Sequence, residues 1–120
     1  MDDEVARVKT TRTDGLVVAE LADRKILDEA IISQIAEQLY ALVAESDSPK
    51  LVLDFQHVSH MSSGALGMLI TLHKRIREKR GEMRLCNIGQ SIYEVFVITR
   101  LNEVFQISDS RDGAIGDLSS

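Results

Sequence analysis

The chain has 120 residues, a net charge of −5 and one cysteine. This length suits one domain with its own core, and a single cysteine excludes an internal disulfide. The negative charge disfavours nucleic acid as the main partner. No apolar run approaches the ~20 residues that span a membrane, and the first residues lack the basic-then-apolar order of a signal peptide. No Cys/His spacing indicates a metal site. We therefore expect a cytoplasmic protein without metal or cofactor.

Two strands and a long helix are predicted before residue 50. Val5–Thr11 alternates weakly, which indicates an edge strand, and Asp14-Gly15 marks a turn. Leu16–Leu21 is the second strand and should pair antiparallel with the first. Residues 22–25 form a polar connection, and Asp28 is the candidate N-cap of the helix. The apolar stripe of this helix comprises Ile31, Ile32, Ile35, Leu39, Leu42 and Val43.

The stretch from residue 51 to residue 72 organises the rest of the chain. Leu51–Phe55 is a near-continuous apolar run around one acid, Asp54, which is typical of a strand buried on both faces. Ser62 and Ser63 stand where the next helix begins. A serine there either caps the free backbone N–H groups or is a modification site whose anionic product the helix favours. The apolar positions of this helix are Ala65, Leu66, Leu69, Leu72, His73 and Ile76.

The remaining elements complete an α/β pattern. The basic segment 73–80 ends the second helix, as a solvated face or as a docking patch for an acidic partner, and Lys79 is expected to be exposed. The other expected features are a left-handed Gly81, a strand at Met83–Cys86 with a buried thiol, a helix capped by Ser91 and Glu94 that runs to about Thr99, a short strand at Val104–Ile107 and a frayed helix at Arg111–Leu118. This order predicts one domain over residues 1–120, with a mixed sheet of four or five strands and helices packed around it.

A hydrolase is the first functional class to consider, because Asp54, His57 and His60 lie close in sequence to the two serines. A nucleophilic triad needs a base within hydrogen-bond reach of the serine and a third group that orients the base. Sequence adjacency does not supply this, and the pattern is not G-x-S-x-G. Gly64 and Gly67 lack the spacing and the lysine of a Walker phosphate-binding loop. We expect these glycines to allow close approach by the sheet or by a partner. We expect no catalytic residue.

Asp54 and the run from Val58 to Gly67, which reads VSHMSSGALG, resemble the signature of STAS domains. These are the anti-sigma-factor antagonists and the related sulfate-transporter modules. The resemblance continues through residues 74–88 and 93–105, so that it covers roughly residues 5–109 and leaves 110–120 as a short helix or tail. It implies the same α/β fold, with four or five strands and helices around them.

The resemblance also implies a function carried out by protein–protein contact. In this family the anti-sigma factor is a serine protein kinase, and it phosphorylates the hydroxyl residue directly before the glycine. That residue is Ser63 here, with Ser62 as the alternate. The unmodified domain binds the kinase and frees the sigma factor, and the phosphorylated domain lets go. The implied partner-binding residues are Asp28, His60, Met61, Ser62, Ser63, Gly64 and Gly67, and self-association is left open.

The sequence departs from the family pattern in three places. Met61 replaces the acid before the serines, Ala65 follows the first glycine, and Arg100 stands where many relatives have glycine. The acid at the start of the first helix is retained as Asp28. If the acids help to place the nucleotide and magnesium of the kinase, the loss at Met61 favours a second hypothesis. The chain would then be a STAS scaffold or ligand-sensing module without a phosphorylation cycle, similar to the stressosome-type proteins.

Overall fold

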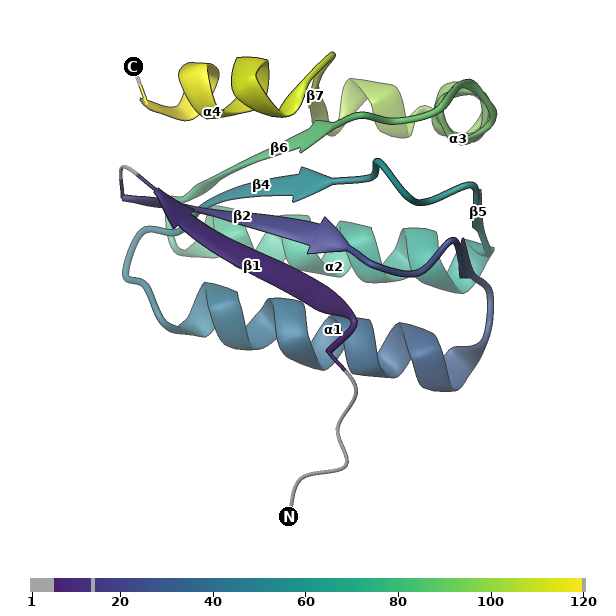
Figure 1. Ribbon diagram of the computed structural model, residues 1–120, viewed down its shortest axis with the longest axis horizontal. Coiled ribbons are helices and arrows are strands. Elements are labelled where there is room, and N and C mark those ends of the chain that lie inside the picture. Colours follow the sequence, from purple (N-terminus) through teal and green to yellow (C-terminus); the bar gives the residue numbers. More distant parts are fainter. Residues whose placement is uncertain (1–5, 14, 120) are drawn as a thin grey trace.

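The computed structural model describes residues 6–13 and 15–119 (Figure 1). Its centre is a five-stranded sheet in the order β1-β2-β4-β6-β7. The first two strands pair antiparallel and the other neighbours pair parallel, so the predicted mixed sheet is confirmed. The strands are β1 Val8–Thr13, β2 Leu16–Leu21, β4 Lys50–Asp54, β6 Glu82–Cys86 and β7 Gln106–Ser108.

Helices cover both faces of this sheet. The helices α1 (Glu29–Ala44) and α2 (Ser63–Glu78) lie side by side on one face, and α4 (Arg111–Ser119) lies on the other (Figure 1). A third helix, α3 (Gln90–Ile98), and the short 3-10 helix η1 (Leu101–Glu103) connect β6 to β7. The larger core lies between the sheet and the helices α1 and α2. The smaller core, under α4, comprises Leu16, Val18, Val52, Cys86, Ala114 and Leu118.

The predicted phase of the second helix is confirmed, with one exception. Its apolar positions are buried except His73, which is half-buried, and the basic residues 74, 75 and 77 are exposed. Lys79 is half-buried, because its Nζ donates to the carbonyls of Val43 at 3.0 Å and Ala44 at 3.4 Å. This cation satisfies the last carbonyls of α1, where a positive charge also complements the helix dipole. Lys79 therefore joins the two helices, and the prediction that it is exposed was wrong.

Several element boundaries differ from the prediction. Two short strands, β3 (Lys25–Ile26) and β5 (His60–Met61), pair parallel in a ribbon that was not predicted. The helix α3 has Gly89 at its N-cap, so the predicted capping box at Ser91 was wrong. The last strand begins at Gln106, because η1 and a turn precede it. The C-terminal helix packs on the sheet with two residues buried, and the predicted start of the first strand at Val5 lies outside the described residues.

The helix α2 ends in a Schellman motif, but its left-handed residue is Arg80 (φ 58°) and not Gly81. The N–H of Arg80 donates to the carbonyl of Arg77 at 2.9 Å, and that of Gly81 donates to Ile76 at 2.8 Å. Gly81 is required for a different reason, since a Cβ there would lie 2.1 Å from the carbonyl oxygen of Pro49. Arg100, which stands where many relatives have glycine, also has a positive φ, at 63°.

Candidate functional site

The two serines at the start of α2 have different roles. Ser62 is the N-cap, because its hydroxyl oxygen accepts the N–H of Ala65 at 3.3 Å. The N–H of Ser62 donates to the carbonyl of Ile26 at 3.1 Å, which ties the start of the helix to β3. Ser63 is the first residue of the helix. The capping role that either serine could have supplied therefore belongs to Ser62.

Ser63 is exposed, and no residue in the described part of the chain hydrogen-bonds its hydroxyl. The first N–H groups of a helix lack intrahelical acceptors, and the helix dipole places partial positive charge there. An anionic group on the Ser63 oxygen would therefore be stabilised locally. Such a modification would not remove the cap, which another side chain provides.

The two glycines of the serine motif are exposed on α2. A Cβ added to Gly64 would make only ordinary contacts, 3.5 Å from Ile32 and 3.7 Å from Ser62, and one added to Gly67 would meet nothing within 4 Å. Glycine within a helix is less stable than alanine by ~0.5–1 kcal/mol. Packing within the described chain requires neither glycine. The sheet does not approach them closely, so contacts within the described chain do not explain them.

The N-terminus of α1 lies beside that of α2. Asp28 is exposed and caps α1 by accepting N–H groups of its first turn. Ile32, one turn further on, faces Gly64, and Figure 1 shows both helices beginning at the same end of the molecule, next to β5. The positive ends of the two helix dipoles therefore reinforce each other there. The structure brings together the acid and the serine motif that the resemblance singled out.

An apolar crevice of 210 Å³ lies beside this motif, between the β3–β5 ribbon and α3. Leu66 and Ile92 line it and are almost fully buried, whereas Leu27 is 50% exposed and Val95 37% exposed. The sequence did not predict this crevice, because its walls come from four separate segments of the chain. It places apolar surface next to the polar serine motif, and burial of such surface is what drives most protein association. The other lining residues are Ser59, His60, Met61 and Ser91.

Asp54 anchors the loop that leads to the serines. Its side chain is fully buried, and one oxygen accepts the Gln56 N–H at 2.9 Å and the Asn87 amide at 3.0 Å. This carboxylate oxygen therefore holds the backbone of the loop through the Gln56 N–H. The other oxygen pairs with Arg111 of α4 at 2.8 Å, and Arg111 also binds Glu20 at 3.0 Å. The hydrogen bond to Asp54 raises the pKa of Arg111. The ion pair, which the sequence did not predict, fixes both the loop and α4.

The histidines of the loop are bound away from the serine pair. His57 Nε2 lies 2.5 Å from a Glu20 oxygen, and His60 Nδ1 lies 3.0 Å from the Ser59 hydroxyl. Neither imidazole is bonded to Ser62 or Ser63 in the described structure, so the triad arrangement does not form. Among the described residues no group of three His, Cys, Asp or Glu side chains is placed to hold a metal ion. In the same part of the chain no helix is both long and apolar enough to cross a bilayer.

Comparison with known proteins identifies the family. The family model for the STAS domain matches residues 7–114, and the chain belongs to the STAS domain family. The candidate anti-sigma factor antagonist BtrV of Bordetella bronchiseptica is 28% identical over 103 residues, which is 86% of each chain. An anti-sigma-factor antagonist (STAS) domain protein from Planctomyces limnophilus has a similar structure, with a TM-score of 0.86 and 22% identity over 94% of this chain and 98% of that one. SpoIIAA of Bacillus in its phosphorylated form matches with a TM-score of 0.70 and 17% identity over 92% and 97% of the two chains.

Proposed function

We propose that this chain is an anti-sigma-factor antagonist that binds its protein partner through the N-terminal end of α1 and α2. One observation carries the proposal: Ser63 presents an unpartnered hydroxyl at the start of a helix, beside two exposed glycines that packing does not require. STAS family membership and the names of the relatives support it. The proposed partner-binding residues are Asp28, His60, Met61, Ser62, Ser63, Gly64 and Gly67.

The partner is an anti-sigma factor that is also a serine protein kinase, in the cytoplasm. The apolar crevice extends the proposed contact surface, because a partner that covers the serines also reaches the half-exposed Leu27 and Val95. Buried apolar side chains at the centre of an interface supply most of its binding energy. The chain acts by binding and not by catalysis, since its loop histidines are engaged by Glu20 and Ser59.

Phosphorylation of Ser63 is the proposed switch. A phosphate adds about 1.5 to 2 negative charges. At a free helix N-terminus this charge is well tolerated, so the domain stays folded. In a desolvated interface the same charge opposes any acidic or apolar surface of the partner, and a penalty of ~2.7 kcal/mol weakens binding about a hundredfold. The switch thus changes affinity without changing the fold.

The test compares Ser63→Ala and Ser63→Asp for binding to the cognate anti-sigma factor by calorimetry. Ser63→Ala should bind as the wild type does and resist phosphorylation. Ser63→Asp should remain folded and lose affinity by about tenfold or more, which corresponds to ~1.4 kcal/mol. Ser48→Asp is the matched control, because Ser48 is exposed in the turn between α1 and β4, at the other end of the molecule. Equal losses for the two aspartate variants would contradict a local switch.

Ser62→Ala separates the cap from the switch. Loss of the cap should lower the free energy of unfolding by ~0.5–2 kcal/mol, and its effect on the affinity of the folded protein should be smaller than that of Ser63→Asp, because alanine adds no charge to the interface. Mass spectrometry after treatment with the kinase should then place the phosphate on Ser63. If neither Ser62 nor Ser63 carries the phosphate, the proposed switch is contradicted.

A second function is favoured by one residue, Met61, which occupies the position of the family acid. Its side chain is an uncharged thioether, half-buried in the β3–β5 ribbon, and it gives a kinase site no carboxylate. A chain that the kinase modifies poorly would act as a constitutive binder or as a STAS scaffold. Met61→Asp should raise the rate of phosphate incorporation if the missing acid limits it. A large homotypic assembly in light scattering, without phosphorylation, would favour the scaffold.

A further inference from the structure

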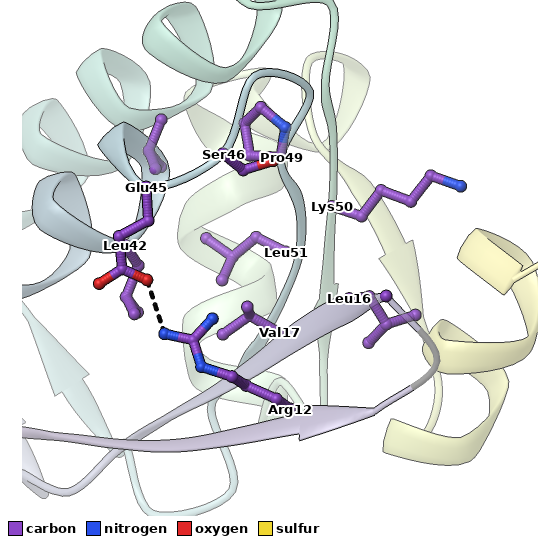
Figure 2. Close-up of a pocket in the computed structure, with 11 residues that line it drawn as sticks. Arg12, Leu16, Val17, Leu42, Glu45, Ser46, Pro49, Lys50 and Leu51 are labelled. Atoms are coloured by element: carbon purple, nitrogen blue, oxygen red, sulfur yellow. Dashed lines mark hydrogen bonds and ion pairs between the residues drawn. The ribbon is translucent and has the colours of Figure 1, made fainter.

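A pocket of 280 Å³ opens at the end of the sheet opposite the serine motif. It lies between the C-terminal end of α1, the β1–β2 hairpin and the start of β4 (Figure 2). Val43 and Leu51 are buried beneath it, and Val17 and Leu42 line it with part of their surface exposed. The interior is therefore apolar. Its volume falls just below the ~300–1,000 Å³ of sites for drug-sized ligands, so it suits a small metabolite.

Two opposite charges face each other at this pocket. Arg12 Nη2 lies 2.6 Å from Glu45 Oε1 (Figure 2), and both side chains are more than half exposed. Lys50 directs its amine away, to the carbonyl of Leu118 at 3.3 Å. The hydroxyl oxygen of Ser46 is occupied by the N–H of Ser48. Among the described lining residues, the charged groups available to a ligand are thus one guanidinium and one carboxylate.

The acidic side of the pocket is the carboxylate of Glu45. Glu45 is the C-cap of α1, and the carbonyls of Val43 and Ala44 in the last turn already accept from Lys79 Nζ, so the carboxylate itself is the group that pairs with a cation. On the opposite side, the planar fork of Arg12 matches the geometry of a carboxylate. The surroundings of the pocket are therefore dipolar, with a carboxylate site on β1 and an ammonium site at the end of α1, next to an apolar interior.

We propose that this pocket binds an α-amino acid with an apolar side chain. The ligand carboxylate pairs with Arg12, the ligand ammonium pairs with Glu45, and the side chain lies against Val17 and Leu42. Exposed ion pairs such as Arg12–Glu45 contribute little to stability. Breaking this pair therefore costs little binding free energy to a ligand that then pairs with both groups. A ligand with only a negative charge would meet Glu45, and one with only a positive charge would meet Arg12.

The first test titrates the full chain with L-leucine by calorimetry. L-leucine should bind saturably with a Kd at or below about 1 mM. Two analogues each lack one charge: 4-methylpentanoate has no ammonium, and 3-methylbutylamine has no carboxylate. Each should bind at least about tenfold more weakly than L-leucine. Equal affinity for either analogue, or no binding of L-leucine up to about 10 mM, would overturn the proposal.

Variants locate the binding in this pocket. Arg12→Gln and Glu45→Gln remove one charge each at exposed positions, and each should weaken L-leucine binding about tenfold. Arg77→Gln and Glu78→Gln make the same charge changes on exposed residues of α2 and should bind as the wild type does. Leu42→Trp should fill the pocket and abolish binding, with folding checked by thermal melting. Unchanged affinity in both Arg12→Gln and Glu45→Gln would overturn the proposal even if Leu42→Trp does not fold.

Discussion

Replacement of Arg100 by glycine should stabilise the protein. Arg100 follows the C-cap of α3 with φ 63° and ψ 17°, and its N–H donates to the carbonyl of Val97 at 3.1 Å. A left-handed conformation costs a residue with a Cβ ~1–2 kcal/mol. The side chain of Arg100 is exposed and has no hydrogen bond or ion pair in the described structure, so its removal loses no contact. Glycine also makes the unfolded chain more flexible, which lowers the free energy of unfolding by ~0.5–1 kcal/mol. The net increase in the free energy of unfolding is therefore ~0.5–1 kcal/mol.

Urea unfolding at constant m-value measures this gain. Arg80→Gly is a parallel case, because Arg80 has φ 58° at the same place after α2, and it should also raise the free energy of unfolding. Glu94→Gly, at an exposed position inside α3, is the opposite control and should lower it by ~1 kcal/mol. A loss of about 1 kcal/mol in Arg100→Gly would show that Arg100 has an ordinary helical conformation and would refute the reasoning.

Three further predictions test the core and its titrating groups. Leu69→Ala should lower the free energy of unfolding by ~2–5 kcal/mol, because Leu69 is fully buried, and a loss under ~0.5 kcal/mol would place the helix in the wrong phase. Burial and the charge of Arg77 lower the pKa of His73, so the folded state binds fewer protons than the unfolded state. Stability should therefore fall as the pH drops through about 6.5, and it should fall less in His73→Gln, as pH-dependent denaturation would reveal. Burial raises the pKa of Cys86 to about 12, so its thiol should react with a disulfide reagent at neutral pH only after unfolding, and rapid reaction of the native protein would contradict its burial.

The spacing of apolar residues and the capping residues in the sequence correctly predicted α1, α2 and β4. The helices α1 and α2 follow from apolar residues at helical spacing, and Asp28 caps the first of them as expected. The strand β4 is buried on both faces, as its apolar run indicated. These features depend on neighbours within one or two turns, and the periodicity of the chain records such neighbours directly.

The features that the sequence did not predict depend on tertiary contacts. The ribbon of β3 and β5 has two residues in each strand, too few for any alternation. A glycine after a helix usually marks the left-handed residue, but the close approach of Pro49 requires Gly81, and the turn falls on Arg80. The partner of Asp54 is Arg111, 57 residues away. Arg111 lies in α4, and the two glycines of that segment, Gly113 and Gly116, disfavoured a stable packed helix in the sequence.

The candidate site also combines a local feature, the Ser62 cap, with tertiary contacts that hold the loop before it. This combination bears on the proposed switch. The serine loop is held at one end by Asp54, through the side chains of Asn87 and Arg111, and at the other end by the bond from Ser62 to Ile26. Neither attachment uses Ser63. A charge added to Ser63 therefore meets a helix end that is already capped and a loop that is already fixed. In the proposed switch the main effect of this charge is therefore on the bound partner, so the modification alters affinity and leaves the fold intact.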